Sequence, residues 1–242
     1  MAATLTAILA AHLLGYLIFQ TKWLKGRQQR IWPIVLRAAI VASLSYMLLG
    51  SFHWQILLVV FLTHLVMGAI KMLFLSDSLA SLLIDESVRL AVVITLAGCF
   101  PDAANGGWWI TGVAPSLSRW YFAALTIVSG IILCVPAGGN LIALLVSRFA
   151  DELRDNNIAG LKQGGKYIGW LERFLVLLLL LMDQPNGIGF LIAAKSILRF
   201  GEIKDPSQRK VAEYIIIGTF LSFGWALLIS ALTQKALKLW MP

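Results

Sequence analysis

Long apolar segments, separated by short polar ones, follow one another along almost the whole chain. A helix needs about 20 mostly apolar residues to cross a bilayer, and inside hydrocarbon it satisfies its own backbone groups. On this criterion we predict eight helical membrane segments, at residues 3–20, 32–50, 54–75, 79–100, 118–138, 167–182, 187–203 and 211–233. The sixth and seventh are short for full crossings, so a re-entrant hairpin with both ends on the cytoplasmic side is the alternative.

The apolar pattern changes character after the fifth segment. Pro136 and Gly138-Gly139 interrupt it, because proline removes a backbone donor and glycine is a poor helix former. Apolar residues then recur at helical spacing opposite charged ones between 141 and 154, which predicts an amphipathic helix on the inner membrane surface. A cytoplasmic extension of the fifth helix is the alternative. The change divides the chain into three parts, residues 1–100, 101–166 and 167–242.

The composition agrees with an all-α, polytopic bundle of membrane helices. The chain has 242 residues, of which 59% are hydrophobic and only 13% charged, whereas soluble domains are nearer half apolar and a quarter charged. Lys and Arg concentrate in the loops 21–31, 139–166 and 203–210, while residues 101–117 contain neither. The positive-inside rule makes those basic loops cytoplasmic and puts both termini outside, with two lysines in the tail as the exception. The net charge of +8 is therefore a topology signal, and we expect no nucleic-acid partner.

The first segment and the cysteines have simple interpretations. The N-terminal 20 residues lack a basic start and carry His12 in the middle of the apolar stretch, which favours a retained helix over a cleaved signal peptide. Cys99 and Cys134 both lie in apolar segments, where free cysteines usually act as packing residues. Neither feature indicates chemistry.

The first four segments each place polar side chains inside an apolar stretch. Residues one helical turn apart share a face of a helix. The polar sets are His12, Tyr16 and Gln20 in the first segment, Arg37 in the second, His64, Gly68 and Lys71 in the third, and Asp85, Glu86 and Arg89 in the fourth. Ionisable groups are costly in hydrocarbon, so we expect those of the four helices to gather in one interior site.

The order of these residues resembles a family of uncharacterised bacterial membrane proteins, domain-of-unknown-function family 3307, whose members open with a His-x3-Asp-x3-Gln helix. The matching positions are His12, Gln20, His64, Lys71 and Asp85. The region from Gly164 to Ala226 resembles the family most closely. The resemblance implies a multi-pass protein of the bacterial inner membrane. Its His/Asp set is similar to those of membrane-bound metal-dependent hydrolases, because imidazole and carboxylate bind zinc and similar ions.

The chain departs from the family pattern at three positions. Tyr16 and Gly68 stand where the family has aspartates, and Arg89 stands where it has a histidine. A guanidinium offers only donors and cannot ligate a metal. The remaining candidate ligands, too few for a hydrolytic site, are His12, His64 and Asp85. We therefore predict no cofactor, with a transition metal as the alternative.

Two readings remain for the arginines of this region. Arg37 and Arg89 can pair with Asp85 and Glu86 as structural ion pairs that lock the bundle. They can also supply the positive charge that a metal would otherwise give, and so bind an anionic headgroup or a small anion.

The C-terminal part carries its charges in two adjacent segments. Glu172 and Arg173 lie early in one, and Lys195 and Arg199 lie near the end of the next. Glu172 and Lys195 are at similar depth across the hairpin, so we predict an ion pair between them, and Arg199 can likewise pair with Glu213. These residues form either a structural set with snorkelling side chains or a basic pocket for phosphate or lipid headgroups.

No enzyme motif stands out in the chain. It contains no G-x-S-x-G elbow, no phosphate-binding loop and no Cys/His ligand spacing. The sequence therefore favours a non-catalytic binding or regulatory protein with a charged interior site that faces the cytoplasm. Its partner would be an anionic lipid headgroup or another membrane protein. The alternatives are a metal-dependent hydrolase of lipid-like substrates and a small transporter.

Overall fold

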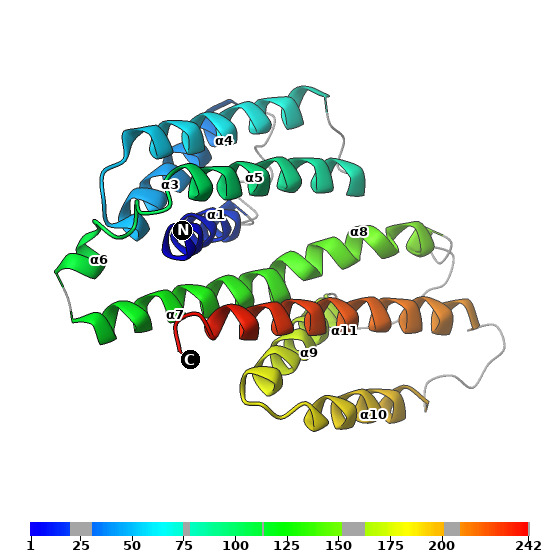
Figure 1. Ribbon diagram of the computed structural model, residues 1–242. Helices are drawn as coiled ribbons and strands as arrows, with labels where there is room; N and C mark the ends of the chain where they lie inside the picture. The colour runs from blue at the N-terminus through cyan, green and yellow to red at the C-terminus, as the bar shows by residue number, and fades with distance from the viewer. Residues whose placement is uncertain (20–30, 75–77, 113, 152–162, 201–208, 242) are drawn as a thin grey trace. The chain divides into compact units, whose positions relative to one another are not determined.

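All regular structure in the computed structural model is helical over the residues that it describes, 1–19, 31–74, 78–112, 114–151, 163–200 and 209–241 (Figure 1). The elements are α1 (Ala2–Phe19), α3 (Ile31–Leu49), α4 (Trp54–Phe74), α5 (Leu79–Cys99), α6 (Trp108–Thr111), α7 (Pro115–Ile132), a π-helical turn η1 (Leu133–Ala137), α8 (Gly138–Asp151), α9 (Gly164–Leu181), α10 (Asn186–Phe200) and α11 (Arg209–Leu237). The all-α prediction is confirmed, and each of the eight predicted segments coincides with a helix.

The helices form two compact units. The N-terminal unit comprises residues 1–129 and 237–242, and the C-terminal unit comprises residues 130–236. In the N-terminal unit α3 packs against α1 and α4, and α5 packs against the same two helices. Glycines permit the close approaches to α3. A Cβ atom on Gly15 would lie 2.3 Å from Cγ2 of Val41, and one on Gly68 would lie 2.4 Å from Cγ2 of Ile34.

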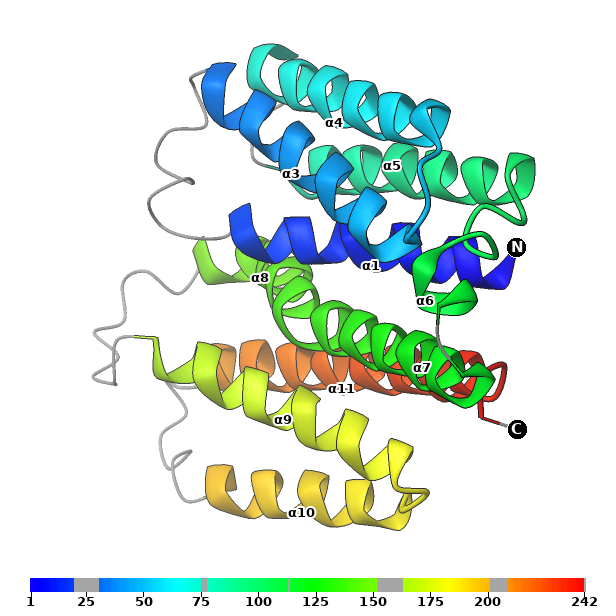
Figure 2. The same cartoon turned by 90° about the vertical axis from the view of Figure 1, so that its left-hand side faces the viewer.

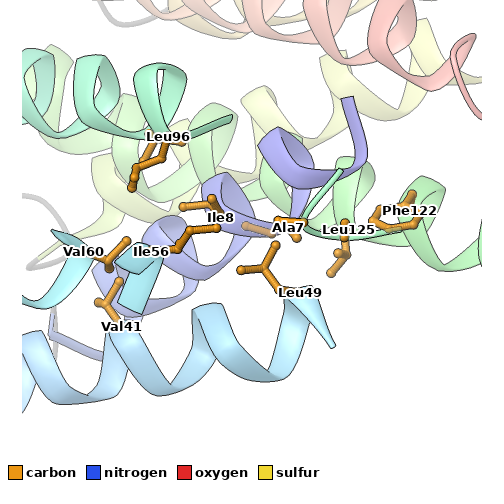
Figure 3. Packing of buried hydrophobic residues seen from close by; sticks show 13 residues of the cluster. Ala7, Ile8, Val41, Leu49, Ile56, Val60, Leu96, Phe122 and Leu125 are labelled. Carbon is orange, nitrogen blue, oxygen red and sulfur yellow. The ribbon is translucent and has the colours of Figure 1, made fainter. Parts of the chain in front are cut away.

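An apolar core fills the N-terminal unit. Figure 3 shows side chains from α1, α3, α4, α5 and α7 meeting there. The fully or almost fully buried members include Ala7, Ile8, Val41, Leu49, Ile56, Val60, Leu96, Phe122 and Leu125. Burying such side chains stabilises a soluble fold by about 1.5–3 kcal/mol each, whereas inside a membrane close packing and hydrogen bonds carry the association of helices.

The segment after α5 closes one end of this unit. The carbonyls at the end of a helix lack intrahelical donors. Those of α3 are satisfied by aromatic side chains: Nε1 of Trp109 donates to the Met47 carbonyl at 2.7 Å, and the Tyr121 hydroxyl donates to the Leu48 carbonyl at 2.8 Å. Gly50 ends the helix with a φ of 71°, a conformation that glycine adopts without steric cost.

The C-terminal unit contains η1, α8, α9, α10 and most of α11. In Figure 2 the helices α9 and α10 form a hairpin. Its turn begins with Asp183 at a φ of 57°, and the N–H of Gln184 donates to the Leu179 carbonyl at 2.8 Å, as in a Schellman motif. This turn is the predicted break between the sixth and seventh segments.

The fifth predicted segment continues into the next helix without a loop. α7 passes through the π-helical turn η1, which contains Pro136, directly into α8. Proline lacks a backbone donor, and π-turns accommodate one residue more than an α-helical turn. The arrangement therefore follows the alternative of an extended fifth helix, with α8 as its amphipathic continuation.

Helix length and apolar surface support an integral membrane protein. Among the described residues, four stretches are long and apolar enough to cross a membrane, namely Ile31–Leu49, Trp54–Phe74, Ser116–Ser147 and Glu213–Leu237, and Ala2–Leu17 and Asn186–Ile197 are shorter apolar helices. Large apolar side chains are exposed along the outer faces of these helices. A soluble monomer rarely exposes so much contiguous apolar surface. α5 and α9 are long helices outside this set, and each carries three charged residues.

Candidate functional site

Three helices of the N-terminal unit bring ionisable side chains together in its interior. α1 supplies His12, α4 supplies His64, and α5 supplies Asp85, Glu86 and Arg89. His12, His64, Asp85 and Arg89 are at most 2% exposed, and the Glu86 side chain is 27% exposed. These buried side chains form a polar cluster, and Arg37, Lys71 and Gln20 are the further residues that the sequence suggested for it.

A chain of hydrogen bonds links α5, α1 and α4. Oε2 of Glu86 lies 3.0 Å from Nε2 of His12, and Nδ1 of His12 lies 3.1 Å from Nε2 of His64. Nδ1 of His64 lies 2.9 Å from the Val60 carbonyl oxygen. A carbonyl only accepts, so Nδ1 of His64 carries a hydrogen and donates. The chain thus runs from a partly exposed carboxyl group to a buried backbone carbonyl.

Beside this chain lies a buried ion pair. Nε of Arg89 donates to Oδ1 of Asp85 at 2.6 Å, one helical turn back along α5. The two terminal nitrogens of Arg89, Nη1 and Nη2, are buried and have no hydrogen-bond partner among the described residues. Buried polar groups are nearly always hydrogen-bonded, and an unsatisfied charged group is more costly still. No acceptor for the outer fork of this guanidinium therefore comes from the described residues.

The other charged residues predicted for this site are Arg37 and Lys71. Arg37 on α3 is close enough to Arg89, Glu86 and Asp85 for their charges to act on it, so it belongs to the same cluster. Lys71 on α4 is half-buried and forms no ion pair with any described residue. Gln20 lies outside the described residues.

The predicted metal candidates are not arranged as a ligand set. Both ring nitrogens of His12 and of His64 take part in the hydrogen-bond chain, and Oδ1 of Asp85 accepts from Arg89. No group of three or more His, Cys, Asp or Glu side chains that could hold a metal ion is present in the described parts of the chain. The candidate metal ligands that the resemblance implies are thus engaged in hydrogen bonds within the protein.

The C-terminal unit forms the ion pair that the sequence predicted. Nζ of Lys195 on α10 donates to Oε2 of Glu172 on α9 at 2.6 Å, and the two side chains are 16% and 11% exposed. The same ammonium group lies 5.5 Å from the centre of the Phe223 ring on α11, a cation–π distance. This pair holds α9 and α10 together.

Arg173 in the same unit is buried and well supplied with acceptors. Its Nη1 donates to the Ser222 hydroxyl at 3.0 Å, and its Nη2 donates to the Val135 carbonyl at 3.2 Å. Val135 lies in the π-helical turn η1, and its carbonyl also accepts from the backbone N–H of Gly138. A Cβ on Gly139 would lie 2.9 Å from Nη2 of Arg173, so this glycine makes room for the guanidinium.

The same π-turn receives a second side-chain donor. Nε1 of Trp225 on α11 donates to the Leu133 carbonyl at 2.9 Å, and a Cβ on Gly138 would lie 2.4 Å from that nitrogen. The sequence marked Pro136 and Gly138-Gly139 as an interruption, but their partners on α9 and α11 could not be read from it.

The remaining predicted pair joins Arg199 and Glu213. The Arg199 side chain lies outside the described residues, and Glu213 is an exposed residue of α11. This pairing stays a prediction.

Comparisons with protein-family models, curated protein sequences and solved structures give no match to the chain. The geometry of the two polar clusters therefore carries the proposed function. The resemblance to domain-of-unknown-function family 3307 stays a prediction.

Proposed function

We propose that this chain is a non-catalytic membrane protein whose N-terminal unit binds an oxyanion on Arg89. The observation that carries the proposal is the pair of terminal guanidinium nitrogens, buried and without an acceptor among the described residues. A guanidinium presents two parallel donors that fit two oxygens of a carboxylate, a phosphate or a similar oxyanion. Because Asp85 occupies Nε, the outer fork of Arg89 stays free for such a ligand.

The surrounding charge supports this assignment. Arg37 adds a second positive charge to the cluster, and Asp85 adds one negative charge. Charged groups inside membrane segments commonly mark binding sites or ion pathways. The oxyanion is either the headgroup of an anionic lipid or a small free anion, and both offer the same chemistry to Arg89. The distribution of Lys and Arg supports an orientation with both termini outside, and the resemblance to the bacterial family supports the inner membrane as its location.

Nitrate is a suitable probe because it is planar, carries one charge and does not titrate. We expect the full chain in phosphatidylcholine nanodiscs to bind nitrate in isothermal titration calorimetry. Replacing part of the phosphatidylcholine by phosphatidylglycerol distinguishes the two sources of anion. A headgroup ligand would compete and weaken nitrate binding, whereas a site for a free anion would be unaffected.

The variant Arg89→Lys keeps the charge but removes the fork, so nitrate binding should weaken by at least about tenfold. Arg119→Lys is the matched control, since Arg119 is an exposed residue of the same unit, and it should bind like the parent protein. If Arg89→Lys does not fold, the double variant Asp85→Asn/Arg89→Gln removes both charges together and should fold without binding nitrate. Equal nitrate binding by this double variant, or no binding by the parent protein in either lipid, would refute the proposal.

A further inference from the structure

We infer that the site takes up one proton together with its anion, and that this proton is held by the chain of Glu86, His12 and His64. The inference rests on the proposed function and adds a second ligand to it. It follows from the donors and acceptors that the geometry requires.

Neutral histidines cannot complete this hydrogen-bond chain when Glu86 is ionised. His64 donates from Nδ1 to the Val60 carbonyl, so its Nε2 is an acceptor in the neutral ring. His12 must then donate from Nδ1 toward His64 and also from Nε2 toward the carboxylate. A neutral imidazole has only one N–H, so one of these two contacts would join two acceptors. Adding one proton removes the conflict.

The additional proton completes the hydrogen-bond chain from any of three positions. It can make His12 an imidazolium beside ionised Glu86, or it can reside on Glu86, which then donates to Nε2 of His12. Alternatively His64 becomes the imidazolium and donates from Nε2. In all three arrangements every contact of the chain has one donor and one acceptor. Groups coupled so closely share the proton rather than titrate separately.

The charge balance links this proton to the anion. The other titratable or charged groups whose charges act within this cluster are Tyr16 on α1, Arg37 on α3, and Asp85 and Arg89 on α5. With two arginines and one aspartate the surroundings carry one net positive charge. The hydrogen-bond chain of Glu86, His12 and His64 is neutral with the additional proton and negative without it. The whole cluster is therefore positive when protonated and neutral when not.

A bound monovalent anion reverses which protonation state of the cluster is favoured. It neutralises the protonated cluster but leaves the unprotonated one with a net negative charge in a buried environment. Charges without compensation are strongly disfavoured there. Binding of the anion and binding of the proton therefore favour each other, and thermodynamic linkage requires the effect to be reciprocal. The site therefore binds an anion and a proton together, with no net charge.

Calorimetry of nitrate binding measures this coupling directly. The full chain in phosphatidylcholine nanodiscs is titrated with nitrate between about pH 5 and 8, the range in which histidine sites commonly change charge. Buffers of different ionisation enthalpy report the protons taken up. We expect up to one proton per nitrate, and an affinity that falls by up to about tenfold per pH unit as the pH rises.

The variant Glu86→Gln tests which groups hold the proton. A glutamine amide donates to Nε2 of His12 and completes the chain without an additional proton. It also removes one negative charge, so the cluster stays positive. Glu86→Gln should therefore bind nitrate with the acid-limit affinity of the parent protein, independently of pH and without proton uptake. Asp102→Asn is the matched control, because Asp102 is an exposed carboxylate of the same unit, and its pH dependence should equal that of the parent protein.

The outcomes separate this inference from the proposed function. Nitrate binding by the parent protein without proton uptake would overturn the proton inference and leave the anion site standing. Unchanged proton uptake in Glu86→Gln would also overturn it, since the proton would then lie elsewhere. Absence of nitrate binding at every pH would refute the proposed function itself. If Glu86→Gln fails to fold, the proton count of the parent protein still decides.

Discussion

Arg89 in the N-terminal unit and Arg173 in the C-terminal unit are both buried arginines among apolar helices, yet their guanidinium groups have different surroundings. Arg173 donates from both terminal nitrogens, to a hydroxyl group and to a backbone carbonyl, and only its Nε lacks a partner among the described residues. Arg89 donates from Nε alone, and both of its terminal nitrogens lack one. Burial of charge therefore does not by itself indicate function.

The neighbours of the two arginines explain the difference. Around Arg173, the Ser222 hydroxyl and the Val135 carbonyl accept from the guanidinium and a glycine at 139 leaves space for it, so the fold itself supplies the acceptors. Around Arg89, the strongest nearby acceptor is a carboxylate on its own helix, and the other carboxyl group, Glu86, bonds to His12. We interpret Arg173 as a structural link between helices and Arg89 as a binding group.

The largest effect should come from Asp85→Ala. This change removes the one hydrogen-bond acceptor that the described residues give Arg89, and breaking one side of a buried ion pair costs about 3–5 kcal/mol. Denaturant unfolding in detergent micelles would measure the loss. Because the fork of Arg89 binds oxyanions in our proposal, added formate should restore part of the stability. The double variant Asp85→Ala/Arg89→Met is the control, since it leaves no unpaired charge, and formate should not affect it. A loss below about 1 kcal/mol for Asp85→Ala would contradict the buried ion pair.

Ser222→Ala makes the corresponding change in the C-terminal unit and should cost less. It removes a 3.0 Å hydrogen bond to a charged group, worth about 1.5–3 kcal/mol, but Arg173 keeps the Val135 carbonyl. The same unfolding experiment measures it, and here formate should have no effect. Ser196→Ala is the control, because this exposed hydroxyl bonds only to the Ile192 carbonyl of its own helix. Rescue of Ser222→Ala by formate would mean that Arg173 is also open to anions.

The positions of the helices could be predicted from the sequence because length and hydropathy alone determine which segments can cross a bilayer. The Glu172–Lys195 pair could be predicted too, since two residues at similar distances from the ends of a hairpin meet at one depth. Asp85 and Arg89 are one turn apart on the same helix, so their pairing also needed no knowledge of neighbours.

Contacts that depend on how helices rotate against one another could not be predicted in the same way. The link from Glu86 through His12 to His64 joins three helices, and its geometry depends on the rotation of each about its own axis. The contact at Gly68 could not be predicted from the sequence either. In the sequence it marks a departure from the family's aspartate, whereas in the fold it lets α4 approach Ile34 of α3. The partners of the π-turn likewise come from distant helices.

The smallest effect should appear in a double-mutant cycle across Glu172 and Lys195. Both side chains keep some exposure, at 11% and 16%, so the pair is less deeply buried than Asp85 and Arg89. The variants Glu172→Gln, Lys195→Met and the double variant should give a coupling energy of about 1 kcal/mol in denaturant unfolding, within the range for residues in direct contact. The coupling should shrink at high salt, because partly exposed pairs are screened. Additive effects would show that the 2.6 Å contact contributes no stability, and Arg173 would then be the principal polar link of the C-terminal unit.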